Sequence, residues 1–225
     1  MSNQTLDATA FEYSISYFNT TFEDILAGIV VVYSCIIATK TKVPLNDENA
    51  IRDIFLSKEY LKSIDFRKSN PPLDNYHFDK EISENQGRAD IRVLQIKPYK
   101  DDDAYYVIEC KRLDNENQNG KTGLNGKYIS NGIARFTNER KYQFFNNTAG
   151  MIGFIVSEMD ICNNVYCINQ LLQNIFTGIN TEKELTKKQI TPDFEYSYYS
   201  NHKVGKSTKI IYHLMLDFSA NTKTS

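Results

Sequence analysis

Apolar and polar positions in the first third of this chain follow helical patterns. Apolar residues run almost without interruption from 25 to 38, which predicts a buried helix over about residues 20–41. The preceding residues 1–19 are polar and aromatic without a clear period, and we expect an arm or a short strand there. A second apolar stripe predicts a helix over residues 47–64, and the proline-containing segment 65–75 is predicted to be a loop.

The rest of the chain contains short apolar runs that are typical of strands, separated by two helical patterns. Strands are expected at residues 76–82, 88–96, 104–111, 150–156, 193–200 and 208–218, and helices at 127–145 and 162–179. Gly and Asn residues make 114–126 a predicted loop. The order predicts an α/β fold with a mixed central β-sheet flanked by helices, an extra N-terminal helix and a C-terminal β-hairpin.

A chain of 225 residues is long enough for one large domain. We expect one globular unit, in which an N-terminal arm and apolar helix, residues 1–46, pack on a domain formed by residues 47–225. The formal net charge is −2, so binding to nucleic acid would need a local basic patch rather than overall attraction. The N-terminus lacks the features of a signal peptide, and the longest apolar stretch is short for a membrane span. We therefore expect a cytoplasmic protein that does not enter the membrane.

Two acidic side chains fall on consecutive predicted strands. Asp90 lies on the first of them, and the sequence Glu109-Cys110-Lys111 ends the second. Side chains alternate faces along a strand, so Glu109 and Lys111 should point the same way while Cys110 points into the core. Two carboxylates and a lysine at the end of a hairpin can hold a divalent cation and a polarised water. A phosphodiesterase is therefore the first functional hypothesis.

This placement of Asp90 and Glu109-Cys110-Lys111, followed by a helix, resembles the PD-(D/E)xK superfamily of restriction-endonuclease-like nucleases over about residues 47–180. Uncharacterised bacterial proteins of this fold, some associated with defence against phage, are similar to this chain at residues 128–142, 150–153, 200–203 and 213–218. The chain departs from the motif at Ala89, where the family name implies proline. The resemblance implies a restriction-endonuclease-like core and a Mg²⁺-dependent deoxyribonuclease in bacterial anti-phage defence or restriction.

The resemblance also implies roles for individual residues. Mg²⁺, for which Mn²⁺ can substitute, prefers hard oxygen ligands, and these would be Asp90, Glu109 and the backbone carbonyl of Cys110. Lys111 would orient the attacking water or stabilise the developing negative charge. Many members of the superfamily add a glutamate from the first core helix. Glu48 is the candidate for that position, and Glu84 is its rival.

Residues 109–141 contain seven basic and four acidic side chains, the reverse of the balance in the whole chain. Candidates for contacts with nucleic-acid phosphates are Arg112, Lys127, Arg135, His202 and Lys203. Lys127 and Arg135 are eight positions apart on one predicted helix and can share a face. His202 and Lys203 are expected in the loop of the C-terminal hairpin. A solvated helix face and a surface turn are the alternative interpretations.

Other functions are compatible with the same residues. Glu109 and Lys111 could form a solvated ion pair on an edge strand, and Asp90 could face solvent. The chain could also be a nuclease-fold binding or scaffold module without independent catalysis, acting in a multi-protein complex. Its size and near-neutral charge favour a homodimer or a partner protein for target choice, with the apolar helix 21–41 as a candidate docking surface. DNA is the expected substrate, and no sequence feature separates it from RNA.

Overall fold

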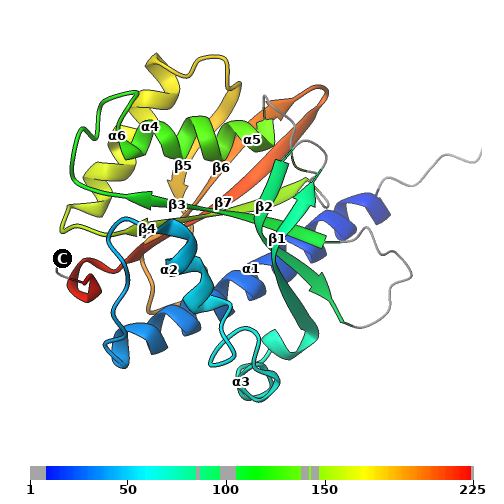
Figure 1. The fold of residues 1–225 in the computed structure, drawn as a ribbon. Coiled ribbons are helices and arrows are strands. Elements are labelled where there is room, and N and C mark those ends of the chain that lie inside the picture. The colour runs from blue at the N-terminus through cyan, green and yellow to red at the C-terminus, as the bar shows by residue number, and fades with distance from the viewer. Residues whose placement is uncertain (1–8, 85–86, 97–104, 138–141, 143–146, 224–225) are drawn as a thin grey trace, which may run out of the picture.

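The protein has an α/β fold built on one seven-stranded mixed sheet (Figure 1). The computed structural model describes residues 9–84, 87–96, 105–137, 142 and 147–223, apart from the side chains of 9–19 and 81–84. In sheet order the strands are β1 (Tyr76–Glu84), β2 (Gly87–Gln95), β3 (Tyr105–Leu113), β4 (Thr148–Ile155), β7 (Ser207–Asp217), β6 (Ser197–Val204) and β5 (Thr181–Lys187). The central strands β3, β4 and β7 are parallel, and the pairs on either side are antiparallel. The predicted mixed sheet is confirmed.

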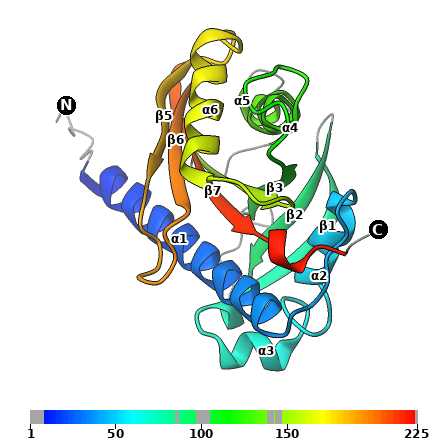
Figure 2. The ribbon, with the colours of Figure 1, turned by 90° about the vertical axis from the view of Figure 1, so that its left-hand side faces the viewer.

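Helices cover both faces of this sheet (Figure 2). One layer contains α1 (Thr9–Ala38), α2 (Glu48–Phe55) and α3 (Ile64–Ser69). The other contains α4 (Leu124–Tyr128), a π-helical segment (Ile129–Ile133), α5 (Ala134–Thr137) and α6 (Ile161–Asn174). Each layer has its own apolar cluster, and neighbouring residues of β4 divide between them: Ile152 belongs to the first cluster and Met151 to the second. Continuous apolar strands such as β4 are expected where both faces are covered.

The first helix is longer than the sequence pattern predicts. It begins at Thr9, so the arm or short strand expected over residues 1–19 is wrong from that residue onward, and residues 1–8 lie outside the described part. Residues 9–19 contain no Gly or Pro. Lengthening an existing helix through them adds one hydrogen bond for each residue that is fixed. Phe22 of α1 stacks on Tyr106 of β3 with ring centroids 4.7 Å apart. The apolar helix therefore packs on the sheet, while the division of the chain into two segments stays a prediction.

The segment Thr20–Ala38 within α1 has the length and the apolar composition of a helix that could cross a membrane. Half of this segment is buried inside the protein, and the core helix of a soluble protein can have the same length and composition. The buried side chains include Ile25, Leu26 and Ile29, which belong to the first apolar cluster. Apolar side chains of α1 therefore contribute to the core, and the cytoplasmic location stays a prediction.

The second helix is shorter than expected. α2 ends at Phe55, so the single helix predicted over residues 47–64 is wrong beyond that point. The chain turns there and brings Leu61 into the apolar core. α3 then occupies part of the predicted loop 65–75, and the hydroxyl of Ser63 caps it by accepting a backbone N–H. A cap of this kind satisfies a donor that would otherwise have no intrahelical partner.

The helix predicted over residues 127–145 begins at Leu124 and contains the π-helical segment, while its predicted end lies mostly outside the described residues. Gly132 of this segment approaches the sheet closely. A Cβ atom at this position would lie 2.4 Å from Met151 Cε and 3.6 Å from Lys111 Cγ. The helix therefore passes directly over β3 and β4 at the position of Lys111.

The C-terminal hairpin is formed by β6 and β7, but the sheet continues into β5, which the sequence pattern does not indicate. β5 is an edge strand with mostly exposed, charged side chains and a buried Leu185, so it lacks the usual apolar alternation. Charged edge strands resist further pairing with other chains. β6 extends to Val204, so His202 and Lys203 lie on a strand and the prediction that they form a hairpin loop is wrong.

Candidate active site

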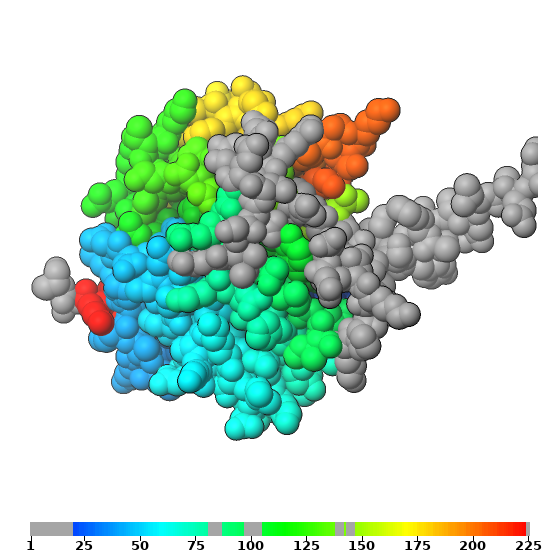
Figure 3. All heavy atoms as spheres, turned by 45° about the vertical axis from the view of Figure 1, so that its right-hand side comes forward, coloured from blue at the N-terminus to red at the C-terminus, as the bar shows by residue number. Residues whose placement is uncertain are grey.

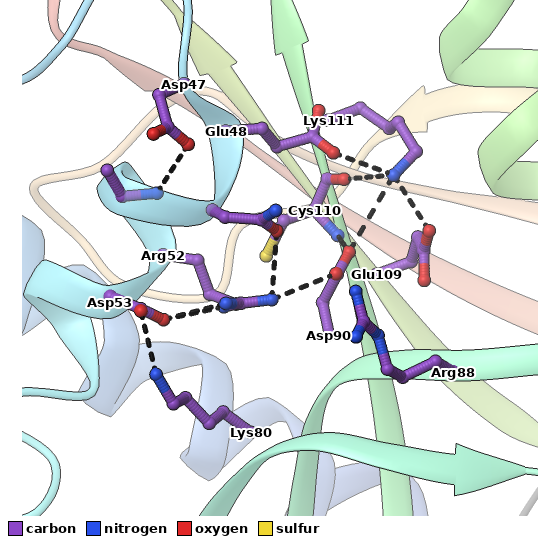
Figure 4. Close-up of polar contacts among 12 residues, drawn as sticks. Asp47, Glu48, Arg52, Asp53, Lys80, Arg88, Asp90, Glu109, Cys110 and Lys111 are labelled. Atoms are coloured by element: carbon purple, nitrogen blue, oxygen red, sulfur yellow. Dashed lines mark hydrogen bonds and ion pairs between the residues drawn. The ribbon is translucent and has the colours of Figure 1, made fainter.

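Asp90 lies where β2 runs beside the end of β3. The two strands pair with Ile91 opposite Ile108. Next to this pair, the backbone N–H of Cys110 donates to Asp90 Oδ2 at 2.8 Å, and Arg52 Nη1 donates to Asp90 Oδ1 at 3.3 Å (Figure 4). The carboxylate is thus held by the backbone of one strand and by a helix side chain, and it does not simply face solvent.

Glu109 and Lys111 point to the same face of β3, as the period of a strand predicts. That face is covered by α4 and the π-helical segment, while Cys110 is buried in the opposite cluster together with Ile108. Glu109 is fully buried and Lys111 is 9 % exposed. β3 lies between β2 and β4, so the solvated pair on an edge strand is excluded.

The Lys111 ammonium is the point at which the acidic side chains meet (Figure 4). Its Nζ lies 2.8 Å from Glu109 Oε1, 3.0 Å from Glu48 Oε1 and 3.7 Å from Asp90 Oδ2. It also donates to the backbone carbonyl of Cys110. Four oxygen atoms from α2, β2 and β3 therefore surround one cation.

Burial and charge together shift the pKa values of Glu109 and Lys111. Burial raises the pKa of Glu109 to about 7, an effect that Lys111 and Arg135 oppose and Asp90 reinforces. Burial alone would lower the pKa of Lys111, but the carboxylates of Glu109, Asp90 and Glu48 outweigh it and raise that pKa above its ordinary value. Lys111 is therefore protonated at neutral pH, so it can donate hydrogen bonds but cannot accept a proton.

Glu48, the candidate for an acid supplied by a helix, brings its side chain into this cluster. The side chain of its rival, Glu84, lies outside the described residues. Glu48 is the first residue of α2, and Asp47 caps that helix by accepting a backbone N–H. One carboxylate oxygen of Glu48 accepts from Lys111, and the other accepts from the backbone N–H of Arg112 at 2.8 Å. These contacts join the start of α2 to the end of β3.

Arg52 is a buried residue of the site that the sequence does not single out. Its guanidinium donates to Asp90 Oδ1 at 3.3 Å and to Asp53 Oδ1 at 2.8 Å (Figure 4). Arginine is seldom buried unless it is paired, so these contacts explain its place in the core. Its signal in the sequence is its position four residues after Glu48, which places both on one face of a helix. Arg52 links α2 to Asp90 and orients that carboxylate.

Glu109 is held on its other side by Arg135 and Tyr142. Arg135 Nη1 donates to Glu109 Oε1 at 2.8 Å, and the Tyr142 hydroxyl lies 2.8 Å from Glu109 Oε2. Arg135 therefore belongs to the charged cluster and is not merely part of a solvated helix face. The sequence does not single out Tyr142, because no local pattern shows that it returns to β3.

A pocket of about 390 Å³ opens beside these charges. Its charged lining residues are two acids and four bases: Asp47, Glu48, Lys111, Arg112, Lys127 and Arg135. Three of the predicted phosphate contacts, Arg112, Lys127 and Arg135, thus line the same pocket as Lys111. A basic wall next to an acidic cluster is an arrangement that can hold a phosphate near a site of reaction.

His202 and Lys203 do not line this pocket. His202 is fully buried, with Nε2 2.8 Å from Ser200 Oγ, which in turn lies 2.8 Å from His213 Nε2. A buried imidazole cannot contact nucleic acid, so the prediction for His202 is wrong. Lys203 lies 3.6 Å from Glu182 in a partly exposed ion pair. The sequence pattern predicts that this strand ends at residue 200, whereas β6 ends at Val204, so the two residues were expected in a basic loop.

The donor set of the cluster suits a hard divalent cation. The carboxylates of Glu48, Asp90 and Glu109 and the carbonyl of Cys110 are oxygen ligands of the kind that Mg²⁺ prefers, and they already surround the Lys111 ammonium. Within the described residues, no group of three His, Cys, Asp or Glu side chains is arranged to hold a metal ion. For these oxygens to hold an ion, the Lys111 ammonium must therefore leave its place between them.

No protein-family model, curated protein or solved structure matches the chain, so the basis for a functional assignment is the arrangement of its own side chains.

Proposed function

We propose that this protein is a Mg²⁺-dependent nuclease that hydrolyses phosphodiester bonds of DNA in the cytoplasm, with a role in bacterial anti-phage defence or restriction. The observation that carries the proposal is the meeting of Glu48, Asp90 and Glu109 at Lys111, at the end of β3. The order of strands and helices around this point supports a restriction-endonuclease-like core. DNA is proposed over RNA because of the resemblance to restriction-type nucleases.

The oxygens of Asp90 and Glu109 and the Cys110 carbonyl would hold Mg²⁺, with Glu48 beside them. When bound, the ion would lower the pKa of a water and neutralise charge on the phosphate. Arg52 keeps Asp90 directed at this point through the 3.3 Å contact with Oδ1. Buried Glu109, whose pKa is raised, becomes a stronger ligand as the pH rises past about 7, because only the carboxylate form binds a cation well.

Lys111 acts as a hydrogen-bond donor in this proposal. Its pKa is raised above the ordinary value by the surrounding carboxylates, so it does not take the proton from the attacking water. Its ammonium instead orients that water or stabilises the negative charge that develops on the phosphate oxygens. Removing one such donor costs about 10²- to 10³-fold in turnover in well-studied enzymes.

The basic wall of the pocket would hold the substrate backbone. Arg112, Lys127 and Arg135 line it beside Lys111, and contacts to phosphates fix the register of a nucleic acid without reading its sequence. Because the chain carries a formal net charge of −2, this attraction is local and should weaken steeply with salt.

A second candidate function is a nuclease-fold binding or scaffold module without independent catalysis. One observation favours it. The Lys111 ammonium lies within hydrogen-bonding distance of two carboxylates and a carbonyl, so the charges of the cluster already compensate one another. Such a module would bind nucleic acid or a partner protein and would not cleave.

Cleavage assays with matched lysine variants distinguish the two functions. The purified chain is incubated with duplex DNA, and separately with RNA, in Mg²⁺, Mn²⁺ or EDTA. We expect metal-dependent cleavage of DNA that Asp90→Asn and Glu109→Gln abolish and that Lys111→Met lowers by about 10²-fold. Lys206→Met is the matched control, because Lys206 is exposed in the turn between β6 and β7.

Each other outcome of these assays is informative. Binding of DNA without cleavage under either metal supports the scaffold module. Unchanged cleavage by Lys111→Met removes the role proposed for that lysine. Cleavage of RNA alone overturns the proposed substrate while leaving the proposed site in place.

A further inference from the structure

A second basic pocket lies between the turn after α2, α3 and the start of β1. It has a volume of about 440 Å³, and its charged lining residues are Lys58, Lys62, Arg67, His77 and Asp79. In the view of Figure 3, α2, α3 and the start of β1 (light blue to cyan) form one continuous lower surface of the molecule. None of these residues belongs to the cluster around Lys111.

Arg67 is the buried member of this pocket. It is 7 % exposed, and its Nη1 donates to the carbonyl of Leu61 at 2.6 Å. Its Nε is buried, and no acceptor among the described residues bonds to it. Buried polar atoms are nearly always hydrogen-bonded, so a buried guanidinium with an unused donor calls for a partner. Arg67 is anchored on one side and lines the pocket.

The charges of the pocket favour an anion. Lys58, Lys62 and Arg67 supply three cations, and Asp79 supplies one carboxylate. That carboxylate is already compensated, because Asp79 Oδ2 lies 2.9 Å from Arg92 Nη2 and Asp79 Oδ1 lies 2.9 Å from His77 Nε2. The local balance is therefore positive in a chain whose net charge is negative.

We propose that this pocket binds a phosphate group, either free or in a nucleic-acid backbone. An arginine fork recognises tetrahedral oxyanions, and the two exposed lysines add mobile point charges at the rim. His77 and Asp79 of β1 pair with Leu94 and Arg92 of β2. The pocket thus lies on β1, the strand next to the one that carries Asp90, and its use by a nucleic-acid backbone rests on the proposed nuclease function.

Two binding measurements in EDTA test this proposal without any cleavage. Inorganic phosphate binding is followed by calorimetry, and duplex DNA binding is followed by fluorescence anisotropy over a range of salt. The test protein is the double variant Lys58→Ala/Lys62→Ala, because both side chains are exposed and the fold does not depend on them. The matched control replaces Lys206 and Lys223 with alanine, since both are exposed and outside the pocket.

We expect the double variant to lose at least tenfold in phosphate affinity while the control does not. A backbone phosphate in the pocket also predicts weaker DNA binding and a salt slope that is smaller by about one, the value for one lost phosphate contact. Loss of phosphate binding with unchanged DNA binding supports a free phosphate as the ligand. Unchanged binding of both overturns the proposal.

Arg67→Lys gives a second and independent test. It keeps the charge but removes the fork, so we expect weaker phosphate binding even though both rim lysines are present. If this variant does not fold, the double lysine variant carries the test alone. Failure of the nuclease proposal would leave the phosphate measurement unaffected, because that measurement uses neither Mg²⁺ nor DNA.

Discussion

The Lys111 ammonium compensates three carboxylates, one fully buried and two partly exposed, that would otherwise repel one another. Glu48, Asp90 and Glu109 come from α2, β2 and β3, and each lies within 3.7 Å of Lys111 Nζ. A bound divalent ion would compensate the same charges. The ammonium and the ion therefore compete for one set of oxygens, which makes the effect of removing the lysine measurable without any substrate.

Lys111→Met should bind Mg²⁺ more tightly than the unchanged protein, although it cleaves less. The melting temperature is measured with and without saturating Mg²⁺, and the shift should be larger for the variant, because a ligand at 100 times its Kd stabilises by about 2.7 kcal/mol. Lys206→Met should behave like the unchanged protein. An equal or smaller shift in Lys111→Met would contradict competition at this site.

Arg52 should be needed for stability as well as for the site. Arg52→Met leaves Asp90 without its guanidinium partner, and breaking a buried ion pair costs about 3–5 kcal/mol in the free energy of unfolding. Lys80→Met is the matched control, since it removes an exposed partner from Asp53 and should cost less than about 1 kcal/mol. Urea denaturation measures both. Equal losses in the two variants would show that Arg52 does not hold the core.

The buried histidines predict a loss of stability in mild acid. Burial lowers the pKa of His202 from 6.5 to about 4 and lowers that of His213 well below its ordinary value. The unfolded chain therefore takes up protons between pH 6.5 and 4 while the folded chain does not. The contribution of His202 to the free energy of unfolding is complete above pH 6.5 and falls by about 3 kcal/mol as the pH drops to 4.

Urea titrations at pH 7.5 and 4.5 check this pH dependence. His202→Gln should remove a large part of the decrease in acid, because the amide does not titrate in this range. Lys206→Gln, at an exposed residue of the turn that follows β6, should leave the decrease unchanged. A decrease of the same size in both variants would assign the acid sensitivity to other groups.

At the scale of elements, strands were more predictable than helix ends. Period-two alternation places Glu109 and Lys111 on one face and Cys110 on the other, and the structure agrees. β5 could not be predicted, because an exposed edge strand has no apolar alternation to indicate it. The end of α2 at Phe55 depends on tertiary packing, which local propensity does not encode.

Gly28 provides a test of how α1 packs. Replacing a helical glycine with alanine usually stabilises a helix by about 1 kcal/mol. At Gly28, however, a Cβ atom would meet the side chain of buried Leu73, with Leu73 Cγ 2.5 Å away. Gly28→Ala should therefore destabilise the protein by about 1–3 kcal/mol in urea denaturation, as overpacked cores do.

Ser34→Ala in the same helix is the control for Gly28→Ala. Ser34 is exposed, so its replacement should change the free energy of unfolding by less than about 0.5 kcal/mol. A stabilising effect of Gly28→Ala would mean that α1 does not press against Leu73.

At the scale of the whole molecule, the sheet order brings the parts of the site together. β3 is antiparallel to β2 and parallel to β4, so the end that carries Lys111 faces α2 on one side and the helix with the π-helical segment on the other. The sequence predicts Asp90, Glu109, Lys111 and Glu48 through the family resemblance. It does not predict Arg52 or Tyr142, because their partners are 38 and 33 positions away in the chain and no local pattern records such contacts.

The proposed function requires that the oxygens around Lys111 form a site for a divalent metal. The most direct test is the anomalous scattering of a crystal of the protein soaked in Mn²⁺. We expect one strong peak about 2.0–2.3 Å from carboxylate oxygens of both Asp90 and Glu109, with the Lys111 ammonium displaced from between them. A crystal in which Lys111 Nζ still lies between these carboxylates, with no peak beside them, would contradict a metal site at this position.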